Sequence, residues 1–231
     1  MITSEDMKRK TIEAGADICG IASVSRFEKA PKGFHPCDIL PDCRSVVVFA
    51  CRFPLSTLKV RTNSPYTLVR NMMVRKLDQI SFRLTEELEN EGVVSIPIPS
   101  ADPYDYWDPQ QNHGRGILSL KHSGVQAGLG GMGKNTLLMN DRFGNMMWLG
   151  AVLVTTDLEP DPVALYEVCV EKCSVCIDSC PQKALDGTTI NQKLCRERSV
   201  TSTGGGGWVL SCNVCRKVCP NHNGTTSKTT E

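Results

Sequence analysis

Two hydrophobic patterns alternate along the first 160 residues of the chain. The run SVVVFAC at 45–51 is apolar and rich in β-branched residues, which predicts a strand buried on both faces. Apolar residues between 67 and 91 recur every three or four positions, which predicts a long helix capped by Gly92. The same reasoning predicts helices at 3–16 and 118–127, strands at 18–24, 93–97 and 146–156, and loops at 31–43 and 99–116. Helices and strands in alternation favour an α/β (α+β) sandwich-like core.

The composition shows no strong charge bias. The 231 residues include 26 Lys+Arg and 25 Asp+Glu, and a net charge of +1 does not favour a nucleic-acid-binding surface. The N-terminal MITSEDMKRK has no apolar core behind its charges, so we do not expect a secretory signal. The longest uncharged apolar stretch, 143–156, is shorter than the ~20 residues of a membrane span. We therefore expect a cytoplasmic protein that does not enter a membrane.

Cysteine is the unusual residue type of this chain. Twelve cysteines occur, and eight of them lie between 169 and 219. Thiols stay reduced in the cytosol, so this clustering predicts metal binding rather than disulfides. Of the others, Cys19 and Cys51 adjoin apolar runs and are expected to be buried. Cys37 and Cys43, with His35, are expected to lie in a loop that binds no metal.

The spacing of the eight clustered cysteines predicts two [4Fe-4S] clusters. Two CxxCxxxCP elements occur, one preceded by Cys169 and one beginning at Cys212, with Cys195 between them. In two-cluster ferredoxins the cysteine before the proline binds the other cluster. This rule gives a first set of Cys169, Cys173, Cys176 and Cys219 and a second set of Cys180, Cys195, Cys212 and Cys215. Two four-cysteine zinc sites are the alternative, although zinc does not require the Cys-Pro endings.

The glycine-rich segment GLGGMGKNT at 128–136 matches two phosphate-binding motifs imperfectly. Its GxGxxG does not follow a predicted strand, and its GxxxxGK has Asn135 where a P-loop needs Ser or Thr. The glycines allow close approach of the backbone to a cofactor, and Lys134 adds a cation. Tight packing of two elements is the alternative.

The motifs together resemble the epoxyqueuosine reductase family, which is related to the corrinoid-dependent reductive dehalogenases. LSLKHSGVQAGLGGMGKNTLL, LGAVLVTTDLEPDP and the two CxxCxxxCP elements carry the resemblance over 117–220, with weaker agreement at 44–50. It implies a nitroreductase-like core over 1–160 that holds a cobalamin, followed by a ferredoxin-like domain over 161–220; we expect 221–231 to be a disordered tail. It also implies that the corrinoid is contacted by Gly128, Gly130, Gly133, Lys134 and Asn135.

Two departures from the family pattern bear on the substrate and the catalytic acid. Only 11 residues follow Pro220, where the family continues into a helical-repeat tail that helps to hold tRNA, so a tRNA substrate is doubtful. The proton-donating aspartate of the family matches Asp102 best, in the run Ser-Ala-Asp-Pro. Asp105, Tyr104, Tyr106 and His113 are alternatives, and a turn aspartate before proline is the structural interpretation.

The resulting hypothesis is an iron–sulfur reductase. Electrons would pass through two clusters to a corrinoid that acts on an electrophilic C–O or C–X bond of a small molecule, while buried Asp102 protonates the leaving group. The alternatives are an electron-transfer protein with FMN or no cofactor in its core, and a structural zinc protein. We also expect a ferredoxin- or flavodoxin-type electron donor and a homodimer.

Overall fold

A four-stranded antiparallel sheet forms the centre of the chain. A computed structural model describes residues 2–165 and 167–225. The strand order is β1 (Ile18–Ser23), β2 (Ser45–Arg52), β8 (Met147–Val154) and β3 (Ser95–Ile98). β2 and β8 pair along their whole length, from Ser45 opposite Val154 to Arg52 opposite Met147. The mixed α/β class is confirmed, and every predicted core strand is present close to its predicted bounds.

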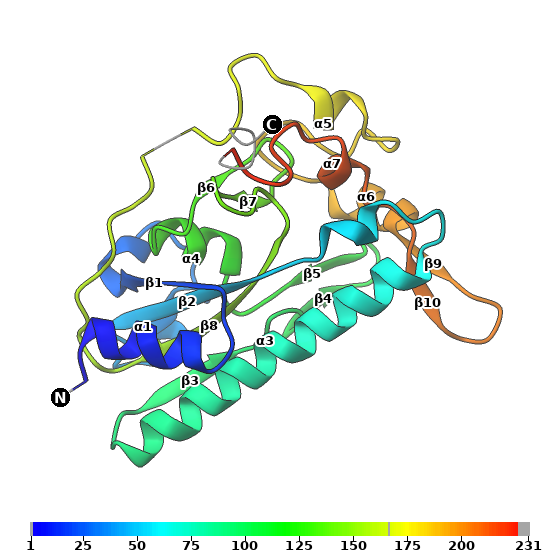
Figure 1. Cartoon of the computed structure of the whole chain (residues 1–231). Helices are drawn as coiled ribbons and strands as arrows, with labels where there is room; N and C mark the ends of the chain where they lie inside the picture. The colour runs from blue at the N-terminus through cyan, green and yellow to red at the C-terminus, as the bar shows by residue number, and fades with distance from the viewer. Residues whose placement is uncertain (1, 166, 226–231) are drawn as a thin grey trace.

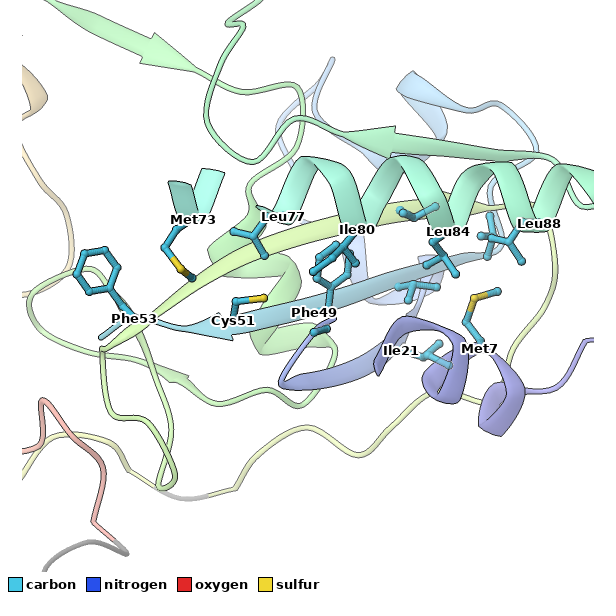
Figure 2. Close-up of a cluster of buried hydrophobic side chains, with 14 of the residues drawn as sticks. Met7, Ile21, Phe49, Cys51, Phe53, Met73, Leu77, Ile80, Leu84 and Leu88 are labelled. Atoms are coloured by element: carbon cyan, nitrogen blue, oxygen red, sulfur yellow. The ribbon is translucent and has the colours of Figure 1, made fainter. Parts of the chain in front are cut away.

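Helices α1 (Ser4–Glu13) and α3 (Ser64–Asn90) cover one face of this sheet (Figure 1). A capping box starts α1, where the backbone N–H of Asp6 donates to Oγ1 of Thr3 at 3.1 Å. One row of α3 side chains packs against Phe49 of β2, namely Leu77, Ile80, Leu84 and Leu88 (Figure 2). The apolar period therefore predicted both the helix and its buried face correctly.

The opposite face carries α4 (Leu120–Gln126), η1 (Val24–Phe27) and α2 (Pro36–Ile39). Val46, Val48 and Ala50 of β2 point into this second core, whereas Phe49 and Cys51 point towards α3. Alternate side chains of β2 thus enter two separate cores, and the prediction of a strand buried on both faces is confirmed.

Two hairpins lie in segments that the sequence analysis treated as irregular. β4 (Tyr106–Asp108) pairs with β5 (His113–Arg115), so the prediction of a loop throughout 99–116 is wrong. Likewise, β6 (Gly131–Met132), inside the glycine-rich segment, pairs with β7 (Leu138–Met139), which follows it. Strands of two or three residues are too short to show a hydrophobic alternation, which is why the pattern did not predict them.

The cysteine-rich segment forms short elements at the end of the molecule away from the N-terminus (Figure 1). They are α5 (Val175–Asp178), α6 (Gln192–Ser199), β9 (Val200–Ser202), β10 (Trp208–Leu210) and α7 (Val214–Lys217), while η2 (Leu55–Leu58) links β2 to α3. Leu210 of β10 donates its N–H to Oγ1 of Thr67 on α3 at 2.9 Å, which ties this segment to the core.

Part of the segment expected to be a disordered tail has a defined position. Within residues 221–225, the backbone N–H of Thr225 donates to the carbonyl of Asp141 at 2.8 Å. The remainder of the expected tail, 226–231, lies outside the described residues. No described helix is both long and apolar enough to cross a membrane.

Candidate functional site

All eight clustered cysteines lie on or beside the three short helices of the cysteine-rich segment. Cys176 is on α5, Cys195 is on α6 and Cys215 is on α7, and α5 packs against α7. Every one of the eight is a free thiol. The short helices bring cysteines from distant parts of the sequence within electrostatic reach of one another.

The first predicted set of thiols is gathered in one place. Burial raises the pKa of the Cys219 thiol, and the neighbouring thiols of Cys169, Cys176 and Cys173 raise it further. The pKa of Cys176 is raised by burial and then by Cys169 and Cys173. Cys219 therefore lies with the early cysteines, as the crossing rule predicts for one cluster.

The second predicted set is gathered in the same way. Burial raises the pKa of Cys215 to about 11; Arg216 opposes the rise, and Cys195, Cys212 and Cys180 add to it. The pKa of Cys195 is raised by burial and also by Cys212 and Cys180. Cys180 therefore lies with the late cysteines, which completes the exchange of one cysteine between the two sets.

The thiols of each set are near one another but do not converge on a single point. In the described part of the chain, no three His, Cys, Asp or Glu side chains are close enough to bind one metal ion. The four sulfurs of a zinc site must each lie about 2.3 Å from the metal. Ligands of a [4Fe-4S] cluster bind four different irons and stand farther apart. Whether the eight thiols bind clusters or zinc stays a prediction.

The glycine-rich segment contacts the cysteine-rich segment, and the two together line a cavity of about 460 Å³. The Lys134 N–H donates to Sγ of Cys169 at 3.3 Å, and its Nζ donates to the carbonyl of Cys173 at 3.0 Å. Nδ2 of buried Asn135 donates to the carbonyl of Cys215 at 3.3 Å. These two residues thus attach both cysteine sets to the core.

Close backbone packing accounts for the glycines themselves. A Cβ at Gly128 would overlap the carbonyl of Pro162, one at Gly130 would overlap the carbonyl of Met139, and one at Gly133 would crowd the Met139 side chain. The glycine-rich segment is thus packed tightly against the backbone at Pro162 and Met139, and tight packing was the alternative interpretation of this segment. Its predicted contact with a corrinoid stays a prediction.

A cavity of about 1020 Å³ lies between the core and the cysteine-rich segment. Its wall includes Phe34, Tyr104, Lys121, Trp148 and Arg216, which come from the loop before α2, the segment before β4, and α4, β8 and α7. Ligand pockets typically measure about 300–1,000 Å³, so this volume suits a large ligand or a cofactor with its substrate.

The second cysteine set adjoins this cavity at two points. Gln192, on the same helix as Cys195, lines the cavity and exchanges hydrogen bonds with the backbone of Gly114 at 3.2 and 3.1 Å. Arg216, which follows Cys215, lines it as well and lies 4.9 Å from the ring of Trp148. Groups bound to these cysteines would therefore be neighbours of a ligand in the cavity.

Asn145 and Arg216 lock the two parts of the molecule together. The guanidinium of Arg216, only 6% exposed, donates to the carbonyl of Asn145, and Nδ2 of Asn145 donates to the carbonyl of Arg216 at 3.2 Å. Asn145 lines the cavity, and its Oδ1 has no hydrogen-bond partner among the described residues, although the residue is only 1% exposed. A buried acceptor without a partner costs free energy that a ligand N–H or O–H would recover.

Asp102 lies at the rim of the cavity and not in its wall. Its carboxylate is 63% exposed and pairs with Arg70 at 3.7 Å, while its neighbours Ala101 and Tyr104 line the cavity. The burial expected of a catalytic acid is therefore absent here, because the side chain points to solvent. Its backbone bond to Pro103 is cis.

The alternative acids differ in where they lie. Asp105 and Tyr106 are exposed, and His113 lies opposite Asp108 in the strand register of the β4–β5 hairpin. Only Tyr104 of these alternatives lines the cavity, and its hydroxyl accepts a hydrogen bond from Arg196 at 3.3 Å.

The remaining sequence candidates take structural positions. Nδ1 of His35 accepts the N–H of Cys37 at 3.1 Å and caps α2, so the prediction of a loop throughout 31–43 is wrong; the helix has only four residues, too few for a periodic pattern. Burial raises the pKa of Cys19 to about 12 and that of Cys43 to about 11. Cys51 is fully buried in the core, as predicted.

Sequence reasoning missed Lys121, Asn145 and Arg216 as cavity residues. The only signal in the sequence was that Arg216 directly follows a cluster cysteine. Lys121 lies in the run LSLKHSGVQAGLGGMGKNTLL and Asn145 directly precedes the predicted strand at 146–156, but neither position indicated a cavity, and the fold alone brings them together.

The fold and the two cysteine sets define a class: an α/β core joined to a cysteine-rich segment with two sets of four thiols beside a cavity. Solved structures share this fold. An epoxyqueuosine reductase from Streptococcus thermophilus superposes with a TM-score of 0.65 at 18% identity, over 96% of this chain and 66% of that one. A catabolic reductive dehalogenase gives 0.70 at 17% identity, over 97% of this chain and 32% of that one.

The chain is a relative of the epoxyqueuosine reductases, as its motifs predicted. It is 31% identical to the epoxyqueuosine reductase of Bacillus anthracis over 93% of this chain and 63% of that protein. It is 33% identical to that of Staphylococcus aureus over 47% of this chain and 31% of that protein. The chain thus spans about a third to two thirds of the length of these relatives. No family model matches the chain.

Proposed function

We propose that this chain is an iron–sulfur reductase that holds two [4Fe-4S] clusters on its eight clustered cysteines and a corrinoid in its cavity. Its reaction would be the reductive cleavage of a C–O or C–X bond in an electrophilic substrate. The observation that carries this proposal is the junction at Cys215 and Arg216, where the second cysteine set meets the cavity wall. When bound, the clusters supply one-electron transfer, and the corrinoid supplies low-valent cobalt.

The cysteine-rich segment would prepare both clusters for electron transfer. Backbone N–H groups donate to the cysteine sulfurs, from Lys134 to Cys169 and from Ala184 to Cys180, both at 3.3 Å. Hydrogen bonds to the sulfurs stabilise the more negative, reduced state of a cluster. The first set lies on the other side of the glycine-rich segment, where a ferredoxin- or flavodoxin-type donor would deliver electrons.

The cavity fits a corrinoid by its size and by its unpaired acceptor. The amide side chains of a corrinoid offer N–H donors, and Oδ1 of Asn145 needs one. A reductive dehalogenase of the same fold supports this choice of cofactor, because its structure suggests a mechanism for B12-dependent dehalogenation. An electron-transfer protein that holds FMN, or no cofactor, in the cavity is the alternative.

Asp102 is the proposed proton donor, and it would have to turn towards the cavity to act. The structure of an epoxyqueuosine reductase from Bacillus subtilis shows that protein with its catalytic aspartate loop swung out of the active site. Asp102 lies at the rim of the cavity here, between the lining residues Ala101 and Tyr104. Asp102→Asn should abolish turnover and keep both clusters, whereas exposed Asp105→Asn should be neutral. Unchanged turnover in Asp102→Asn would remove this residue from the mechanism.

Two substrates are candidates. One is a small electrophile that enters the cavity directly. The other is an epoxyqueuosine-modified tRNA stem loop, because a solved epoxyqueuosine reductase of the same fold holds that stem loop. The comparison thus weighs against the doubt that the sequence analysis raised about tRNA.

Cobalt and flavin content tests the proposal. The protein is purified anaerobically from cells supplied with cobalamin, and its metals and absorption spectrum are measured. We expect about eight irons and one cobalt per chain. Iron without cobalt but with bound flavin would support the alternative, and zinc without iron would contradict both.

A further inference from the structure

The described wall of the cavity carries many cations and no carboxylate. Its charged lining residues are Arg26, Lys29, Arg115, Lys121 and Arg216. No Asp or Glu occurs among the described lining residues, although the whole chain is nearly neutral. A cavity lined by one sign of charge concentrates ligands of the opposite sign.

Of these cations Arg216 is buried and Lys121 is half-buried, and their charges lie close enough to interact. Burial lowers the pKa of Lys121, and the nearby Arg216 lowers it further. Neither side chain takes part in an ion pair with any described residue. Two neighbouring cations in a sheltered place repel each other unless an anion lies between them.

Lys121 is positioned by its neighbours but still has donors to offer. Its Nζ donates to the carbonyl of Thr136 at 2.7 Å, the one hydrogen bond that the described residues provide to it. An ammonium group has three donors. The fixed position and the unused donors are what an anion-binding lysine requires.

The thiolates of the second cysteine set are the competing source of negative charge. Arg216 is next to Cys215 in the sequence, and a loaded cluster there would offset part of its charge. Burial lowers the pKa of Lys121 and Cys215 opposes this larger effect only in part, but Lys121 comes from α4 in the core and lines the cavity. A ligand in the cavity is therefore the better counterion for Lys121.

We propose that Lys121, with Arg216 beside it, is an anion-binding point, so that the ligand of this cavity carries a carboxylate or phosphate group. This inference rests on the proposed function for the chemistry that follows binding. The anion could belong to the substrate or to the nucleotide phosphate of a corrinoid, and binding measurements separate the two.

Benzoate and benzamide are suitable probes because they differ in charge and hardly in shape. Binding to the anaerobically purified protein is followed by calorimetry and by the fluorescence of Trp148 in the cavity wall. We expect benzoate to bind at least tenfold more tightly than benzamide, which is about 1.4 kcal/mol. Lys121→Met should abolish this preference, Lys121→Arg should restore most of it, and Lys32→Met, outside the cavity, should leave it intact.

The two sources of the anion give different results in cobalamin-loaded protein. If benzoate still binds with its preference, the anion belongs to the substrate. If cobalamin blocks benzoate and binds more weakly to Lys121→Met, the anion is the cofactor phosphate.

The proposal is overturned if benzoate binds no better than benzamide. It is also overturned if Lys121→Met shifts only the reduction potential of a cluster, because Lys121 would then serve the cysteine set. If the purified protein holds no iron but still prefers benzoate to benzamide, the anion site is supported. That result would contradict only the proposed function.

Discussion

Replacing Arg216 with methionine should loosen the junction between the core and the cysteine-rich segment. The change removes the donor to the Asn145 carbonyl and the contact of the guanidinium with Trp148 at 4.9 Å. An unsatisfied buried carbonyl costs about 1–3 kcal/mol, and a sheltered cation–π contact contributes about 1–2 kcal/mol. Methionine fills a similar space, so we expect a net loss of about 2–4 kcal/mol.

The assay is urea unfolding under anaerobic conditions, followed by tryptophan fluorescence and by the visible absorption of the clusters. Lys217→Met is the matched control, because Lys217 is the next residue and is exposed. We expect the control to stay within about 0.5 kcal/mol of the native chain. The reasoning is refuted if Arg216→Met loses less than about 1 kcal/mol, or if the control loses as much.

Further predictions concern the core and its buried thiol. Leu84→Ala, in the buried row of α3, should lower the free energy of unfolding in urea by about 2–5 kcal/mol. Phe82→Ala, on the exposed side of the same helix, should lower it far less. Equal losses in the two variants would contradict the packing of α3. Gly130→Ala should lower the melting temperature by several degrees, because the added Cβ would overlap the Met139 carbonyl. An unchanged melting temperature would mean that the backbone at Gly130 can move away from Met139. Burial raises the pKa of Cys19 to about 12, so the folded thiol keeps its proton after the unfolded one has lost it. Stability should therefore fall between about pH 9 and pH 12, by up to ~1.4 kcal/mol per unit, and Cys19→Val should lessen that slope; an identical slope would refute the assignment.

Long-range periodicity made the core predictable from sequence. β2 and α3 each contain enough residues for the pattern of burial to repeat, and both were located to within a few residues. The assignment of the cysteines to two clusters rests on the spacing of thiols along a tight loop, and it stays a prediction.

The cavity could not be predicted in this way. Lys121 and Arg216 are far apart in the sequence, and only the docking of α7 against the core places them together. The motif around Asp102 likewise indicated a position in the chain but not the direction of its side chain, which pairs with Arg70 in solvent. The β4–β5 hairpin depends on contacts such as that of Arg115 with Tyr106 at 4.9 Å, which no periodic pattern reveals.

Iron and sulfide content in two cysteine variants tests the central claim most directly. Cys215→Ser removes a thiol of the second set beside the cavity, and Cys37→Ser removes a thiol of α2 outside both sets. We predict about eight irons per native chain, about four in Cys215→Ser, and about eight in Cys37→Ser. Full iron content in Cys215→Ser, or an equal loss in Cys37→Ser, would contradict the assignment of two cysteine sets to two clusters.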